Sequence, residues 1–182
     1  MKTCYFTGLR PHEFPFDHAD ESTHAHILYT DALYQKAEEL IRRGYTAFVT
    51  GFSPGAELDF ACAVIYHKNE TFRNVLNIIL DGISSASKLN PEWPDKYFKQ
   101  YGYVLSNCDR KTPEPSEHRP NDRHMEHTID HADLIFAVWN GEETGKTWDI
   151  IRYVKKNNNV LQRNIYKPPQ KLDGQATFLL KN

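Results

Sequence analysis

The chain of 182 residues is long enough for one globular domain with a core and too short for two of ordinary size. Its 22 lysines and arginines stand against 24 acids, so the formal net charge of -2 excludes a global basic field that would hold a nucleic-acid backbone. No apolar run approaches the roughly 18 to 20 residues that cross a bilayer, and the amino-terminal run is too short for a secretory signal. We therefore expect a cytoplasmic protein that catches any anionic ligand with local groups.

Short apolar runs alternate with longer amphipathic segments, which is typical of parallel strands joined by crossover helices. The expected strands cover 3–8, 45–51, 73–80, 103–107 and 133–139, with a last strand or edge segment at 159–167. The expected helices cover 24–43, 55–69, 91–102, 123–132 and 144–157, and the charged, proline-rich segment 109–122 is expected to be a surface loop. This order predicts a single α/β domain, Rossmann-like, whose mostly parallel, doubly wound sheet has helices on both faces.

The three cysteines, Cys4, Cys62 and Cys108, are widely spaced and contain no CxxC pair. This spacing argues against a disulfide scaffold and against a cysteine-based zinc site. We expect reduced cysteines that pack in the core.

The segment "NGEETGKT" ends like a phosphate-binding P-loop but departs from that motif at its start. Asn140 occupies the first glycine position, and Glu142 and Glu143 would repel a phosphate inside the loop. We therefore exclude an ATP or GTP hydrolase. The glycines are expected to form a turn before a helix whose first N–H groups still offer an anion site, with Lys146 left open. The residues concerned are Gly141, Thr144, Gly145 and Thr147.

Three glycine-bearing loops, at 7–11, 50–57 and 140–147, follow expected strands and should meet at the carboxyl edge of the sheet. In the second loop Gly51 and Gly55 flank a turn whose N–H groups would converge on a phosphate, and Ser53 adds a hydroxyl. Arg10 follows the turn at Gly8 and is a candidate phosphate clamp. The alternative for Arg10 is a structural ion pair.

Glu57 falls in the first turn of the expected second helix. A carboxylate there interacts well with the helix dipole whatever its function. The functional interpretation is an acceptor for ribose hydroxyls or a general acid/base at an anomeric carbon. The sequence leaves both open.

These loops resemble the SLOG superfamily, Rossmann-like domains related to the nucleotide-binding part of DprA and to the LOG phosphoribohydrolases, and look most like its YpsA branch. The matching segments are "TGLRP", "TGFSPGAELDFACAV", "HRPND" and "IDHADLIFAVWNGEETGKTWDII", in that order. The resemblance implies a nucleotide or nucleotide-derived phosphorylated ligand held between the loops. By analogy with the LOG enzymes it also implies nucleoside-monophosphate N-glycosidase activity through Glu57 and Arg10. The glycine loops depart from the LOG pattern, so a ligand sensor or carrier stays open beside the enzyme.

The resemblance further implies that Arg119 and Arg123 close over a phosphate or a base, with a charged surface loop as the alternative. Aromatic Trp93, Tyr97 and Phe98 are candidates for stacking on a base or for packing in the core. The complete ligand set is Gly8, Arg10, Gly51, Ser53, Gly55, Glu57, Arg119, Arg123, Gly141, Thr144, Gly145 and Thr147. No cofactor is expected, and a homo-oligomer is left open.

Two other classes of function compete with nucleotide binding. One is a regulatory interaction domain whose pocket is vestigial. The other is a metal hydrolase, since His124, His127 and His131 fall on one face of the expected fourth helix. Such a metal site needs a third ligand and a cleft that the sequence does not reveal, so a solvated helix face is favoured.

Overall fold

A parallel β-sheet forms the centre of the molecule. The computed structural model describes residues 1–84, 93–113, 121–157 and 165–168. In these residues the sheet has the strand order β4-β3-β2-β1-β5-β6, and every pairing is parallel. The strands are β1 (Lys2–Gly8), β2 (Tyr45–Thr50), β3 (Ile79–Ser84), β4 (Arg110–Pro113), β5 (Leu134–Val138) and β6 (Ile165–Tyr166).

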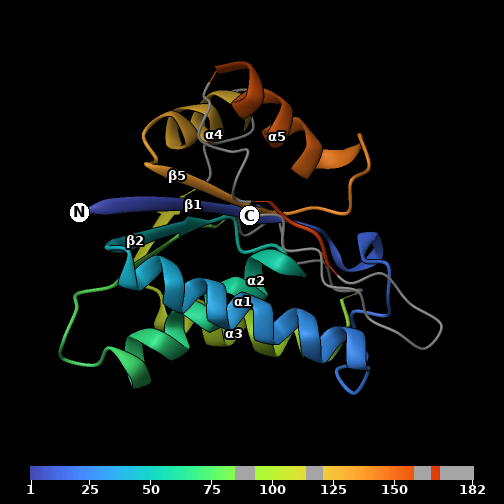
Figure 1. Cartoon of the computed structure of the whole chain (residues 1–182), viewed down its shortest axis with the longest axis horizontal. Helices are drawn as coiled ribbons and strands as arrows, with labels where there is room; N and C mark the ends of the chain where they lie inside the picture. Colours follow the sequence, from blue (N-terminus) through green and yellow to red (C-terminus); the bar gives the residue numbers. More distant parts are fainter. Residues whose placement is uncertain (85–92, 114–120, 158–164, 169–182) are drawn as a thin grey trace.

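Helices cover both faces of this sheet, as Figure 1 shows. One face carries α1 (His24–Arg42), α2 (Ala56–Tyr66) and α3 (Asp95–Asn107), and the opposite face carries α4 (Asn121–Asp130) and α5 (Gly145–Asn157). A short 3-10 helix, η1 (Pro11–Glu13), follows β1, and a π-helical turn, η2 (His67–Thr71), follows α2. The predicted fold class, a doubly wound α/β domain, is therefore confirmed.

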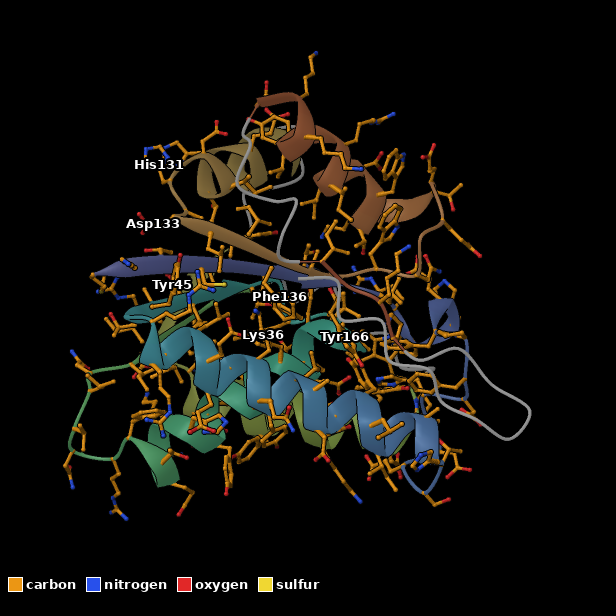
Figure 2. The ribbon with its side chains drawn as sticks, in the orientation of Figure 1. Lys36, Tyr45, His131, Asp133, Phe136 and Tyr166 are labelled. Atoms are coloured by element: carbon orange, nitrogen blue, oxygen red, sulfur yellow. The ribbon has the colours of Figure 1, made fainter. Side chains whose placement is uncertain are left out.

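Each face of the sheet has its own apolar core. On the α1–α3 face, the rings of Phe6 and Phe60 stack with centroids 4.2 Å apart, and Phe136 lies 5.3 Å from each of them. Figure 2 shows Lys36 of α1 reaching toward this core, with its Nζ 5.9 Å from the centroid of Phe136. On the other face Tyr5 and Ile135 pack against α4 and α5, among other buried side chains. Burial of both faces explains why the central strands read as continuous apolar runs.

The strand order reverses beside β1. The chain proceeds outward from β1 to β4, then returns to place β5 on the other side of β1. In open parallel sheets such a reversal separates the loops that leave the two neighbouring strands and creates a crevice at their carboxyl ends. At the opposite, amino edge the same two strands are pinned together, because Asp133 accepts from the Thr3 N–H at 2.7 Å and donates its own N–H to the Thr3 carbonyl (Figure 2).

The third helix differs from the sequence prediction, which ended it at Gly102 and placed a strand at 103–107. Helix α3 continues through Gly102 to Asn107. Its buried residues Tyr97, Tyr101 and Val104 keep helical spacing across the glycine, so packing outweighs the cost of glycine in a helix. The fourth strand instead lies at Arg110–Pro113, inside the segment predicted as a loop. It is a short, charged edge strand that ends in proline and carries no apolar alternation.

The third strand is shifted from the predicted 73–80 to Ile79–Ser84. Asn74 adopts a left-handed φ of 62°, which interrupts the run, and Val75 is 74% exposed. The strand then continues through Gly82, where an added Cβ would lie 1.8 Å from the Phe52 ring. Gly82 is therefore accommodated inside the strand, because the Phe52 ring of the loop after β2 packs directly against it.

The remaining sequence predictions for the fold agree where the structure describes the chain. Cys4, Cys62 and Cys108 are free thiols that belong to the α1–α3 core or pack against it. The predicted last strand is present at its end as β6, whereas 159–164 lies outside the described residues. Across the described ranges, the helices are too short or too polar to cross a bilayer.

Candidate functional site

The loops that follow β1, β2 and β5 meet at the carboxyl edge of the sheet. The Ala56 N–H, at the start of α2, donates to the Leu9 carbonyl at 3.0 Å and joins the second loop to the first. Asn140 Nδ2, after β5, donates to the Glu13 carbonyl at 3.1 Å and joins the third loop to the first. The loop after β1 therefore lies in contact with both of the others.

Two of the predicted glycines permit this close approach. A Cβ on Gly8 would lie 2.5 Å from the Cβ of Ala56. Gly55 has a φ of 92°, and a Cβ there would lie 2.4 Å from the Leu9 carbonyl oxygen. Both distances are shorter than non-bonded carbon contacts allow, so the two loops require residues without side chains at these points.

Glu57 is buried, with 3% of its surface exposed. One carboxylate oxygen accepts from Thr7 Oγ1 at 3.4 Å, and the other accepts from the Ser53 N–H at 3.0 Å. An added Cβ on Gly51 would lie 2.7 Å from this carboxylate, so the glycine makes room for it. Glu57 thus ties the end of β1 to the loop after β2, while its predicted contact with a ribose stays a prediction.

The expected phosphate site in the second loop already uses part of its donors within the protein. The Ser53 N–H donates to Glu57 and the Ala56 N–H donates to Leu9. The Ser53 hydroxyl oxygen is buried and has no hydrogen-bond partner among the described residues. A phosphate at this helix start would therefore compete with existing bonds, and the predicted role of Gly51 and Gly55 stays untested.

A smaller hollow of about 440 Å³ lies at the reversal of strand order, between the loops after β1 and β5. Its lining includes Glu13, Asn140, Glu142 and Thr144. One Glu13 oxygen accepts from the Arg10 N–H at 2.6 Å, and the other lies 2.9 Å from where a Cβ on Gly145 would stand. The start of α5 therefore faces a carboxylate of the protein itself, which disfavours phosphate in this hollow.

A larger hollow of about 760 Å³ opens beside it, over the loop after β1 and the start of α3. Its volume lies within the range of roughly 300 to 1,000 Å³ that ligand pockets occupy. Aromatic and proline side chains make up most of the wall, and the polar members are few. The lining comprises Arg10, Pro11, His12, Phe14, Phe16, Asp17, His18, Ala19, Pro54, Trp93, Pro94 and Tyr97.

Arg10 is the strongest cationic group at this hollow. Its backbone is held in place, because the Arg10 N–H donates to Glu13 and its carbonyl accepts from the Glu13 N–H at 2.9 Å. Arg10 as a residue is half-buried, and its guanidinium makes no hydrogen bond or ion pair within the described residues. The alternative predicted for Arg10, a structural ion pair, is therefore not formed with its neighbouring acids Glu13 and Asp17.

A buried polar network that the sequence analysis did not identify borders the larger hollow. His18, only 1% exposed, lies 2.9 Å from the Tyr97 hydroxyl through Nδ1 and 2.7 Å from Asp59 Oδ2 through Nε2. Asp59 also accepts from the Tyr29 hydroxyl at 2.8 Å and from Gln100 Nε2 at 2.7 Å. The loop after β1 and helices α1, α2 and α3 each contribute to this network.

Hydrogen bonds and burial fix the protonation states of Asp59 and Tyr97 in this network. Burial alone raises the pKa of Asp59, but hydrogen bonds from His18, Gln100 and Tyr29 outweigh it and bring that pKa below 3.8. Burial, followed by the charges of Asp59, Asp17 and Glu21, raises the pKa of Tyr97 to about 12. At neutral pH, Asp59 is therefore a carboxylate and Tyr97 keeps its proton.

Four more of the predicted site residues lie apart from the larger hollow. Thr144 lines the smaller hollow, Gly141 adopts a φ of 99° in the turn before α5, and Thr147 is buried in α5 with 4% exposed. Arg123 lies in α4, on the opposite face from the larger hollow, and Arg119 lies outside the described residues.

The histidine face of α4 is open to solvent where its side chains are described. His127 and His131 are both exposed, and their rings stack with centroids 4.1 Å apart. Within the described part of the chain, no group of three histidine, cysteine or acidic side chains is arranged to hold a metal ion. The metal alternative therefore gains no support from these residues.

Comparison of the chain with models of protein families and with curated proteins finds no match. Function is therefore inferred from the geometry of the two hollows and from the resemblance of the loops.

Proposed function

We propose that the protein is a cytoplasmic SLOG-like domain, of the YpsA-like type, that binds a nucleotide or nucleotide-derived phosphorylated ligand in the larger hollow. The single observation that carries this proposal is that half-buried Arg10 lines an aromatic hollow and that its guanidinium has no ion-pair partner in the described residues. A guanidinium is the side chain best suited to bind phosphate through two parallel hydrogen bonds.

The composition of the hollow favours a ligand with both an anionic and an aromatic part. Arg10 and the exposed His12 provide cationic or hydrogen-bonding contacts for a phosphate. Half-buried Trp93 offers a ring on which a base can stack, and Phe14 extends the apolar wall. Asp17 supplies a carboxylate acceptor for sugar hydroxyls. These groups match the chemistry of a nucleotide more closely than do the carboxylates of the smaller hollow.

The position of the hollow supports the same conclusion. It lies at the carboxyl edge, next to the reversal of strand order between β1 and β5, where open α/β sheets bind their ligands. Gly55 and Glu13 fix the backbone on either side of Arg10, so the guanidinium is carried by a rigid loop. We assign Glu57 to positioning of the loops, since both of its oxygens accept from protein donors.

Isothermal titration of the full chain with AMP, ATP, NAD and ADP-ribose tests the proposal. Arg10→Ala should weaken binding of the best ligand by about 1.5 to 3 kcal/mol, or roughly 10- to 150-fold, because a charge-assisted contact to phosphate is lost. Arg10→Lys should recover part of the affinity.

Arg43→Ala serves as the matched control, because Arg43 is an exposed arginine at the end of α1, away from the hollow's lining. It should bind like the wild type. Equal affinity of the Arg10→Ala and wild-type proteins would refute the site. Absence of affinity for every nucleotide would favour the regulatory interaction domain with a vestigial pocket.

A further inference from the structure

A line of hydrogen bonds connects the larger hollow to the interior of the protein. Tyr97 and His18 both border the hollow, and Asp59 lies behind His18 in the first turn of the buried helix α2. The contacts join positions 79 and 41 residues apart in the chain. They are therefore built by the tertiary fold and not by one helix.

The direction of the two hydrogen bonds follows from the charge of Asp59. An ionised carboxylate only accepts, so His18 must donate through Nε2. In a neutral imidazole the other nitrogen, Nδ1, then carries a lone pair and accepts the Tyr97 hydroxyl proton. The order of hydroxyl, imidazole and carboxylate is the order in which an activated hydroxyl, its base and the base's orienting group are arranged in enzymes.

The imidazole is held rigidly for this task. The ring of Phe14 lies 4.4 Å from the His18 ring between centroids, and the rings of His26 and Tyr97 lie 5.4 and 5.9 Å away. Lys96 donates to the His18 carbonyl at 2.9 Å and fixes the backbone. Tyr29 and Gln100 hold Asp59 from two other directions. The donor and acceptor atoms are thus positioned before any ligand arrives.

We propose that Tyr97, backed by His18 and Asp59, is a general base that removes a proton from water beside the ligand in the larger hollow. The inference rests on the proposed function, because the ligand must occupy that hollow. Tyr97 is the catalytic residue, and His18 and Asp59 are positioning residues that act through it. No other group of the network is required to contact the ligand.

The step balances for hydrolysis of a nucleoside monophosphate. An O–H bond of water breaks, and its proton joins the Tyr97 oxygen while the original Tyr97 proton moves to His18 Nδ1. The water oxygen bonds to the anomeric carbon, and the bond from that carbon to the base breaks with its electron pair on the base nitrogen. The proton on His18 Nδ1 then moves back to the Tyr97 oxygen, and Tyr97 gives one proton to the nitrogen of the departing nucleobase. The nucleobase therefore leaves as a neutral molecule. Asp59 stabilises the transient imidazolium.

A measurement without ligand tests the direction of the relay. Nitrogen-15 NMR of the full chain with labelled histidine reports which ring nitrogen carries the proton, and His18→Gln identifies the His18 signals. We expect a protonated Nε2 and an unprotonated Nδ1, and we expect Tyr97→Phe to shift the Nδ1 signal. A proton on Nδ1 would overturn the relay.

A second measurement follows release of free base from AMP, GMP, CMP and UMP by chromatography. Tyr97→Phe should lower release by about 10²- to 10⁴-fold, the usual effect of losing a general base, while AMP binding changes by less than about threefold. Tyr29→Phe removes the tyrosine hydroxyl that donates directly to Asp59, and Tyr29 is not part of the hollow's lining, so the loss of base release should stay below about tenfold. Tyr103→Phe, at an exposed position on α3, should release base at the wild-type rate.

The outcomes separate the relay from the binding proposal. Binding of AMP by the wild type without release of base from any of the four nucleotides would overturn the relay alone. Equal loss in Tyr97→Phe and Tyr29→Phe would reduce Tyr97 to a structural role and overturn it too. Failure of the wild type to bind any nucleotide would instead overturn the proposed function.

Discussion

Replacement of Gly55 by alanine should destabilise the protein more than the same change at Gly44 or Gly102. Its φ of 92° and ψ of -140° lie in a region that side chains disfavour by about 1 to 3 kcal/mol. The new Cβ would also lie 2.4 Å from the Leu9 oxygen and 3.2 Å from Arg10 C, and overpacking of this kind costs about 1 to 3 kcal/mol. The expected total is a loss of about 2 to 6 kcal/mol in the free energy of unfolding.

Two further glycines separate strain from steric contact. Gly44 has a φ of 88° but nothing within 4 Å of an added Cβ, so Gly44→Ala should cost about 1 kcal/mol from strain alone. Gly102 lies inside α3 with open space around it, so Gly102→Ala should stabilise the protein by about 0.5 to 1 kcal/mol.

Urea unfolding followed by circular dichroism measures all three changes. With an m-value of about 2 kcal/mol/M, Gly55→Ala should lower the midpoint by about 1 M or more, and Gly102→Ala should raise it slightly. Gly55→Ala should also weaken nucleotide binding, because the displaced segment carries Arg10. An unchanged midpoint for Gly55→Ala, or equal destabilisation by Gly102→Ala, would refute the close contact between the two loops.

Three other substitutions test the network and the sheet by urea unfolding. Because the pKa of Asp59 is lowered by folding, its stabilisation is complete above pH 3.8 and disappears as the pH falls through the folded-state pKa. Asp59→Asn should therefore lower the free energy of unfolding by about 3 kcal/mol at pH 7 and by less at pH 3. An equal loss at both pH values would contradict an ionised Asp59. Burial, then the charge of Lys96, lowers the pKa of His26, so the wild type should lose stability as the pH falls below 6.5. An equal loss of stability in the His26→Gln protein would exclude His26 as the cause. Asp133→Ala should lower the free energy of unfolding by about 1 kcal/mol, because the Thr3 N–H loses its acceptor. An unchanged free energy of unfolding would show that other bonds hold the amino ends of β1 and β5 together.

Local sequence signals predicted the central strands and most helices because each carries its own pattern. The five residues of β5 are all buried, so their apolar run stands out in any window. The edge strand Arg110–Pro113 has no such run, since only one of its sides pairs with another strand and half of its residues, Arg110 and Lys111, are charged. Gly102 was interpreted as a helix end because an exposed glycine within a helix resembles one that terminates it.

The candidate site was predictable only in part, because some of its residues follow a local sequence pattern and others are brought together only by the tertiary fold. The glycine loops and Arg10 follow strands directly, so their place at the carboxyl edge follows from a parallel sheet. The pairing of His18 with Asp59 spans 41 positions and depends on how α2 packs against the first loop. One signal was present: Asp59 stands between Leu58 and Phe60 in a helix that is apolar apart from Glu57 and Asp59 in its first turn, and a buried acid needs a partner.

The most direct test of the central claim is the affinity of the wild-type and Arg10→Ala proteins for the best-bound nucleotide, measured by titration calorimetry in the same buffer. We predict saturable binding at one site per chain in the wild type and a loss of about 10-fold or more in Arg10→Ala, with Arg43→Ala unchanged. Wild-type affinity in Arg10→Ala, or an equal loss in Arg43→Ala, would contradict a nucleotide site in the larger hollow.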